Sequence, residues 1–199
     1  MKSVKRSSEI LLDIAHDRKL DGDLTFHRIL QLLGDRAFGL AIIFFALPSM
    51  LPVSAVPGIS LLFGIPILTL SLQMIFMRKT MWLPKRVGDH TISHKTIVKI
   101  IHASTCYLQK MEFFLKPRLV FITSKYMEMI NGLMLLVLAF LLMLPIPLSN
   151  FIFASLIIIF SLGLMEKDGV FILVSYVGGI IYVAFIYNII FVVVKTIFY

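Results

Sequence analysis

The chain has 199 residues, of which 59% are hydrophobic and 15% charged, and its formal net charge is +8. Soluble domains hold about 45–50% apolar and about 25% charged residues, so this composition excludes an ordinary soluble domain. Ten of the Lys and Arg residues, against three Asp and Glu, lie in residues 78–130, which therefore carry most of the positive surplus. A basic segment between apolar ones indicates a cytoplasmic face in contact with anionic lipid headgroups, and it argues against nucleic acid as a partner.

Residues 1–36 are polar but have an amphipathic, basic pattern. We expect this N-terminal segment to lie at the membrane surface, or alternatively to pack as a soluble cap on the cytoplasmic side. The first apolar run starts near Ala37, behind this charged segment, so the pattern predicts insertion through internal segments and no signal peptide. The single cysteine, Cys106, excludes an internal disulfide and a cysteine-based zinc site.

Residues 37–78 form two apolar arms joined by a proline-rich linker. The first arm, Gly39 to Pro52, would be about 21 Å long as a helix, against a hydrocarbon core of about 30 Å. This pattern favours a re-entrant hairpin that enters and leaves on the cytoplasmic side; two full crossings starting near Leu30 are the alternative. Helix breaks are predicted at Pro48, Pro52, Pro57, Gly58, Gly64 and Pro66.

A second copy of this pattern occupies residues 131–166, with breaks predicted at Pro145 and Pro147. The two copies align with a shift of 93 residues and no gap. This register aligns Gly39 with Gly132, Met50-Leu51-Pro52 with Met143-Leu144-Pro145, and Gln73 with Glu166. The intervening segment, residues 79–130, is predicted to be cytoplasmic or interfacial and not to cross. Both hairpins should then enter from the same side, related by an axis along the membrane normal.

Residues 170–194 form one apolar run, about 37 Å long as a helix, which is enough to span a bilayer with some tilt. The predicted fold is therefore a single all-α membrane domain over residues 1–199. It consists of an internal duplication of two proline-broken helical hairpins, amphipathic interfacial helices and a long C-terminal transmembrane helix.

No catalytic arrangement is visible in the sequence, which has no glycine-rich phosphate loop, no HExxH motif and no nucleophile elbow. We therefore predict that the protein is not an enzyme and needs no cofactor. His90 and His94 have the i,i+4 spacing of two ligands on one helix face. Such a pair in a basic loop is more often solvated, so no metal site is predicted.

Polar groups inside or beside the apolar segments are the candidate substrate-binding residues. Backbone groups freed at helix breaks are tolerated in a membrane only inside protein or along a wet cavity, and helix ends there can bind an ion or a polar headgroup. Simple capping of helix ends is the alternative role for the serines. The candidate set is Arg36, Ser49, Ser54, Ser60, Gln73, Arg118, Ser149, Asn150, Glu166 and Asp168.

An ordered set of short motifs runs through residues 20–185. They include Gly34-Asp35-Arg36-Ala37-Phe38-Gly39, Ala46-Leu47-Pro48-Ser49-x-Leu51-Pro52, Pro57-Gly58-Ile59-Ser60, Trp82-Leu83-Pro84 and Leu144-Pro145-x-Pro147-x-Ser149-Asn150. Together they resemble the ExoD family, bacterial integral membrane proteins named for exopolysaccharide synthesis. The resemblance implies a multi-pass protein of the inner membrane with a link to exopolysaccharide or envelope physiology.

From the broken hairpins we expect a transporter-like protein with a polar cavity for an ion, a small solute or a lipid headgroup. The alternative is a non-transporting assembly factor or scaffold for polysaccharide biosynthesis. The expected partners are the lipid bilayer, anionic lipid headgroups and the polysaccharide-synthesis machinery, and a homo-oligomer is compatible with this fold.

Overall fold

The protein is seen here in a computed structural model that describes residues 24–25, 30–31, 33–34, 36–51, 59–78, 81–82, 91–92, 115–144 and 149–198. The α-helices in these ranges are α3 (Arg36–Ala46), α4 (Ile59–Ile75), α7 (Lys125–Met143), α8 (Ser149–Glu166) and α9 (Gly169–Phe198). Two short 3-10 helices are η2 (Leu47–Met50) and η4 (Val120–Thr123). Two-residue strands β1 (Leu24–Thr25) and β2 (Thr91–Ile92) pair antiparallel. Apart from this strand pair, the described chain is helical, as predicted.

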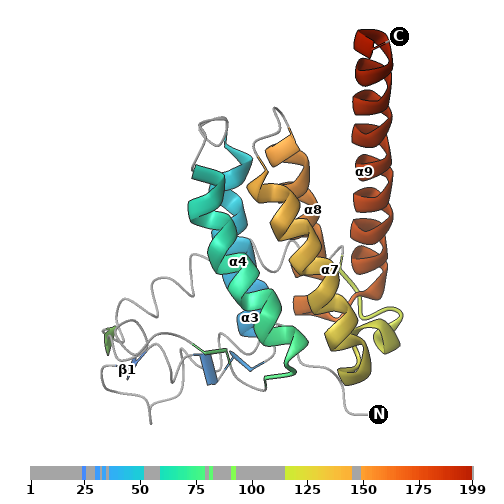
Figure 1. Cartoon of the computed structure of the whole chain (residues 1–199). Coiled ribbons are helices and arrows are strands. Elements are labelled where there is room, and N and C mark those ends of the chain that lie inside the picture. The colour runs from blue at the N-terminus through green and yellow to red at the C-terminus, as the bar shows by residue number, and fades with distance from the viewer. Residues whose placement is uncertain are drawn as a thin grey trace.

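Helices α3 and α4 form one hairpin, and α7 and α8 form a second one beside it (Figure 1). We call the end at which η2 ends and α8 begins the tip end, and the opposite end, at which α7 and α9 begin, the base end. Both hairpins have their tips at the same end (Figure 1). Helix α9 starts at the base end and extends beyond both tips, so its second half stands apart from the other helices (Figure 1).

Each hairpin packs more extensively on the other hairpin than on itself, with α4 against α7 and α3 against α8. Two glycines bring the backbones together in these contacts. A Cβ atom on Gly39 would lie 2.9 Å from the carbonyl oxygen of Ser161. A Cβ atom on Gly132 would lie 2.8 Å from the backbone nitrogen of Ile75 and 3.0 Å from the carbonyl oxygen of Ser71. Such close approach of helix backbones is typical of small residues at helix interfaces in membranes.

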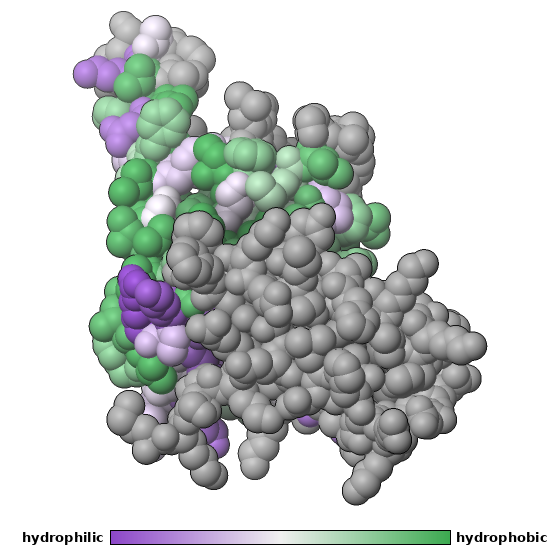
Figure 2. Space-filling model, turned by 180° about the vertical axis from the view of Figure 1, so that it is seen from behind, coloured by the Kyte–Doolittle hydropathy of each residue, from purple (hydrophilic) through white to green (hydrophobic). Residues whose placement is uncertain are grey.

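The core lies between the two hairpins, where apolar side chains at helical spacing are buried. They include Phe38, Ile42, Ile67, Met74, Leu135, Leu138, Leu142, Phe153, Ile157 and Phe160. Many equally large apolar side chains point outward, and Figure 2 shows hydrophobic residues covering α9 and the neighbouring helices on one face. A soluble monomer rarely exposes so much continuous apolar surface, but a bilayer covers it.

Three helices are long and apolar enough to cross a membrane, judged by length and composition. These are α7, α8 and the part of α9 from Gly169 to Thr196. The segments Arg36–Met50 and Ser60–Ile75 are apolar but shorter. The structure is therefore compatible with a membrane protein, and the long C-terminal helix has the place that the sequence predicted.

The predicted helix breaks have different outcomes. Pro48 lies where α3 tightens into the 3-10 helix η2, so the chain does change geometry at this proline. Helix α4, in contrast, continues without interruption through Gly64 and Pro66, so the predicted breaks at these two positions were wrong. Gly64 instead makes room for the side chain of Met143 on α7. A proline is tolerated within such a helix because packing against a neighbouring helix compensates for the lost hydrogen bond.

Several predictions concern residues outside the described ranges. These are the breaks at Pro52, Pro57, Gly58, Pro145 and Pro147, the candidate Ser54, most of the amphipathic segment 1–36 and most of the basic segment 79–130. Helix α7 begins at Lys125, so the expected boundary between residues 130 and 131 falls inside this helix.

The corresponding helices of the two hairpins end in the same way. At the end of α4, Met77 has a φ of 49° and the N–H of Arg78 donates to the carbonyl of Gln73, at 3.1 Å. At the end of α8, Lys167 has a φ of 57° and the N–H of Asp168 donates to the carbonyl of Gly163, at 2.8 Å. This left-handed residue with a six-to-one hydrogen bond is a Schellman cap, which normally uses glycine.

Candidate functional site

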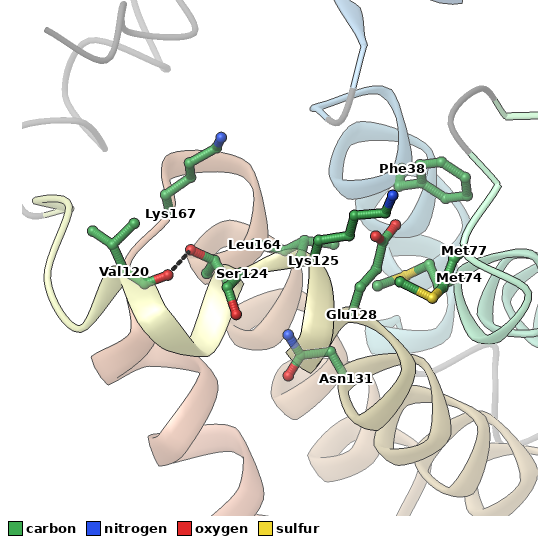
Figure 3. A pocket seen from close by; sticks show the side chains of 11 residues that line it. Phe38, Met74, Met77, Val120, Ser124, Lys125, Glu128, Asn131, Leu164 and Lys167 are labelled. Carbon is green, nitrogen blue, oxygen red and sulfur yellow. Dashed lines mark hydrogen bonds between the residues drawn. The ribbon is translucent and has the colours of Figure 1, made fainter. Parts of the chain in front are cut away.

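A pocket of about 550 Å³ opens at the base end, where the N-terminal part of α7 faces the ends of α4 and α8 (Figure 3). Its lining residues are Phe38, Met74, Met77, Val120, Thr123, Ser124, Lys125, Glu128, Asn131, Leu164 and Lys167. This volume lies in the range of small-molecule sites, which are mostly apolar with a few convergent polar groups. It is therefore the candidate binding site.

Polar and apolar side chains lie next to one another around this pocket (Figure 3). Lys125 and Glu128 extend from α7 toward the part beside Phe38, and Lys167 extends from the opposite side (Figure 3). Ser124 is the N-cap residue of α7, but its side chain makes no capping hydrogen bond. Cationic, acidic and hydroxyl side chains thus line the pocket together with apolar ones.

Asn131 forms the most deeply buried polar part of the pocket wall, and only 1% of its surface is exposed. Its side-chain N–H donates to the carbonyl of Ile122 at 2.8 Å, and its amide oxygen accepts from the hydroxyl of Tyr176 at 2.6 Å. These bonds join α7 to η4 and to α9. Buried polar groups of this kind are satisfied in order to avoid a desolvation cost, and here they fix the wall of the pocket.

The tip end contains a second polar cluster, which joins several of the predicted residues. Asn150 donates through its side-chain nitrogen to the hydroxyl of Ser60 at 2.6 Å, a bond between the first turns of α8 and α4. The hydroxyl of Ser149 lies 3.0 Å from that of Tyr182 on α9. Ser49 is fully buried, and its hydroxyl makes no hydrogen bond to any described residue. The cluster holds the two hairpins and α9 together at this end.

Two of the predicted substrate-binding residues have their polar atoms engaged by the backbone. The side-chain amide of Gln73 makes both of its bonds to Trp82, accepting from the N–H at 2.6 Å and donating to the carbonyl at 3.2 Å. The carboxylate of Asp168 accepts from the N–H of Lys116 at 3.1 Å and from that of Val170 at 3.0 Å. Gln73 therefore anchors the chain after α4, and Asp168 caps α9.

The remaining predicted residues lie at the base end. Arg36 begins α3 and Glu166 ends α8, and both are buried, with 6% and 7% of their surfaces exposed. Since Gly39 packs against Ser161 and Met165, these two charges lie at the same level of the α3–α8 contact. Arg118 is exposed, and its carbonyl accepts from the N–H of Gly169 at 2.7 Å.

The predicted residues are thus divided between the two ends of the bundle, and none of those described lines the base pocket. The sequence does not distinguish the pocket residues, because they are mainly apolar residues of ordinary helices and lysines within segments that are basic throughout. One signal was present: in the register of 93 residues, Phe38 aligns with Asn131, and both line the pocket.

Long apolar helices, a core between two hairpins and a pocket at the base end are typical of an all-α membrane protein. Residues 7–188 match the family described as "Exopolysaccharide synthesis, ExoD". The chain therefore belongs to the ExoD family, as its motifs predicted.

Two relatives extend this assignment. The chain is 34% identical over 157 residues to the protein ExoD of Rhizobium meliloti (strain 1021), a match that covers 77% of this chain and 65% of that relative. It is 28% identical over 187 residues to an uncharacterised protein of Synechocystis sp. (strain ATCC 27184 / PCC 6803 / Kazusa), covering 92% of this chain and 88% of the relative. The chain thus spans less than two thirds of the length of the Rhizobium protein. No solved structure matches it.

Proposed function

We propose that this protein is a transporter-like component of exopolysaccharide synthesis, located as a multi-pass protein in the bacterial inner membrane. In this proposal the base pocket binds the transported solute or headgroup. Membership in the ExoD family supports the link to exopolysaccharide synthesis. The pocket between the two hairpins supports a binding role rather than a purely structural one.

The proposal includes an internal duplication, which the helix ends and the glycine contacts support. The first arms correspond with a shift of 93 residues, since Leu51 bonds to Pro48 as Leu144 bonds to Leu141. The second arms correspond with a shift of 90 residues. With this shift, Met77 matches Lys167 at the Schellman caps, and Ser71 matches Ser161 beside the two close glycines. The linker of the first hairpin would then be three residues longer, and Gln73 would match Gly163 instead of Glu166.

The proposed function rests on the position of the pocket relative to the two repeats. Three pairs of equivalent residues line it: Phe38 with Asn131, Met74 with Leu164, and Met77 with Lys167. In this proposal, a cavity lined by both members of each pair lies at the interface between the repeats. Secondary transporters bind their substrates at the interface between structural repeats, including repeats that are related by an axis along the membrane normal.

Filling the pocket tests this function. Leu164→Trp adds bulk to the pocket lining. Because the larger side chain excludes the ligand, exopolysaccharide production is expected to fall about tenfold or more. Production is measured in a strain whose only copy of the gene is carried on a plasmid. Leu133→Trp, the same change at an exposed position of α7, is the matched control and should preserve production. Both variants are checked for membrane abundance and for a monodisperse peak in detergent. Normal production with Leu164→Trp would refute the binding role of the pocket.

The second candidate is a non-transporting assembly factor, and the exposure of α9 is the observation that favours it. After Tyr182, which contacts Ser149 at the tip end, this helix presents large exposed side chains, including Phe185, Tyr187 and Phe191. A partner helix in the membrane could pack there, as could lipid. The assembly role predicts that Leu164→Trp leaves production unchanged, which is the opposite of the outcome expected for the pocket.

We further propose that the first hairpin is re-entrant, since its apolar helical segments are shorter than the about 20 residues that a membrane-spanning helix usually has. Leu51→Cys at the tip and Lys195→Cys near the end of α9 are compared on a Cys106→Ala background, with a membrane-impermeant thiol reagent added on the periplasmic side. We expect labelling of the cysteine at position 195 and protection of the one at 51. Equal labelling of both would show that the first hairpin crosses fully.

A further inference from the structure

The tip end brings together the N-termini of α4 and α8, the second helices of the two hairpins (Figure 1). The first turns of these helices are in contact, since the side-chain nitrogen of Asn150 donates to the hydroxyl of Ser60 at 2.6 Å. The first four N–H groups of an α-helix have no partner inside the helix, and the N-terminus acts as about half a positive charge. Two such ends side by side produce a positive potential that suits one negative charge.

The hydroxyl of Ser49 is the second observation that points to a ligand at this end. Ser49 is the buried residue of the 3-10 helix η2, with 0% of its surface exposed. Its hydroxyl makes no hydrogen bond within the part of the chain that the structure describes. Burial of a hydroxyl without a partner is unfavourable, because its bonds to water are lost and not replaced. A ligand that accepts a hydrogen bond from this hydroxyl removes the penalty.

The packing of η2 directs Ser49 toward the start of α8. Helix η2 packs more on α8 than on α4, and Ser49 is on its buried side. Helices α3 and α8 run antiparallel, with Gly39 against Ser161 and Met165 (Figure 1). Ser49 is ten residues after Gly39, so the residues opposite it are about ten before this contact, in the first turns of α8. The hydroxyl and the helix N-terminus therefore lie at the same level of the bundle.

A further hydroxyl hydrogen is present beside the N-terminus of α8. Ser149, the first residue of this helix, is fully buried, and its hydroxyl lies 3.0 Å from that of Tyr182. Each of these hydroxyls has one hydrogen, and the bond between the two uses only one of them. The other hydrogen can be donated to a ligand at the same place.

The tip end has no charged side chain that could take the place of a ligand. Residues 37–77, 129–165 and 169–194 contain no Lys, Arg, Asp or Glu. A cation is disfavoured beside two helix N-termini, and an anion with several charges would lose its hydration without a cation to compensate for the loss. A single negative charge is therefore the best match.

The depth of the tip end also suits an anion held by helix ends. Tyr182, which contacts Ser149, is thirteen residues and about 20 Å along α9 from Gly169. This is near the middle of the segment Gly169–Thr196, which is long and apolar enough to cross a membrane. Secondary transporters bind anionic groups at the N-termini of interrupted helices near the middle of the bilayer, where a low dielectric constant strengthens the interaction.

We propose that the tip end binds a small monovalent anion, of the size of a halide ion, between the hydroxyl of Ser49 and the N-terminus of α8. The N-terminus of α4 adds its positive potential. The ligand is small because Ser49, Ser149 and Asn150 are all buried, with at most 8% of their surfaces exposed. This site is separate from the base pocket, and the inference does not depend on the role proposed for that pocket.

Thermal melting of the full-length protein in a maltoside detergent tests the site. Chloride replaces gluconate, a monovalent anion too large for a buried site, at constant sodium concentration and ionic strength. The melting temperature should rise with chloride and then saturate, with a gain of about 3–6 °C at ten times the dissociation constant. Equal melting temperatures in chloride and gluconate, or a rise without saturation, would overturn the proposal.

Ser49→Ala distinguishes an anion ligand from a hydroxyl that is merely buried. In gluconate this variant should melt at least as high as the unmodified protein, because an unpaired buried hydroxyl is removed. Its midpoint for chloride should shift to concentrations at least about tenfold higher, because the anion loses a donor. Ser155→Ala, also on α8, removes a hydroxyl that bonds to the carbonyl of Phe151 in its own helix, and this matched control should keep the full response to chloride. An unchanged chloride midpoint in Ser49→Ala would refute the site.

Discussion

Replacement of Gly132 by leucine is expected to lower the free energy of unfolding by about 3 kcal/mol, the upper end of the usual overpacking cost. Even a Cβ atom at this position would lie 2.8 Å from the backbone nitrogen of Ile75 and 3.0 Å from the carbonyl oxygen of Ser71. Backbone atoms of a neighbouring helix cannot rotate away as a side chain can, so α7 and α4 must separate. The melting temperature in detergent should fall by about 6–12 °C.

The control for this prediction is Gly178→Ala on α9. A Cβ atom there would lie 2.7 Å from Leu156, but the atom that it meets is the terminal Cδ2 of a flexible side chain. This variant should melt within about 2 °C of the unmodified protein, since Leu156 can change its rotamer. Gly39→Leu should behave like Gly132→Leu, because its Cβ would meet the backbone oxygen of Ser161. A normal melting temperature for both leucine variants would contradict the close packing of the hairpins.

Replacement of Asp168 by alanine is the second change with a large expected effect, again about 3 kcal/mol of unfolding free energy. Its carboxylate caps α9 through the N–H of Val170, a contribution of about 1 kcal/mol. It also accepts from the N–H of Lys116, and a hydrogen bond to a charged group contributes about 1.5–3 kcal/mol. Since Asp168 is only 1% exposed, water does not replace these bonds readily.

Thermal melting measures the size of this loss, and hydrogen exchange shows its location. Exchange at residues 115–118 should accelerate in Asp168→Ala, because the bond that holds Lys116 is lost. Asp168→Asn keeps one acceptor oxygen and should lose roughly half as much stability. Asn188→Ala, on the exposed part of α9, removes only a hydrogen bond to its own helix and is the matched control. A uniform increase of hydrogen exchange over the whole chain would contradict a local role of Asp168 in holding residues 115–118.

Most of the fold could be predicted because its signals are local. Apolar runs of sufficient length, interrupted by prolines and bounded by charges, indicate helical hairpins in any membrane protein. The alignment of Gly39 with Gly132 was also visible, and both glycines do lie at the contacts between hairpins. Pro66 shows the limit of this reasoning: its sequence signal is a break, but the contact between α4 and α7 keeps the helix continuous.

The candidate site could be predicted only in part, because a residue's role depends on which groups lie opposite it. Ser60 and Asn150 are both predicted site residues, and they are hydrogen-bonded to one another at the tip end. Gln73 and Asp168 are predicted binding residues, but their polar atoms hold the backbone of Trp82 and of Lys116 instead. No local pattern contains this information, since Asp168 and its partner Lys116 are far apart in the chain.

The amino-acid sequence by itself determined the apolar helices, the hairpin pattern and the family, because hydrophobicity, proline positions and motif order are properties of the chain. Only the tertiary structure decided that each hairpin packs mainly on the other, with Gly39 and Gly132 between them. The same packing placed Phe38, Asn131 and Lys167 around one pocket. The physical reason is that burial and polar partnership arise from contacts between segments, which exist only once the helices have come together.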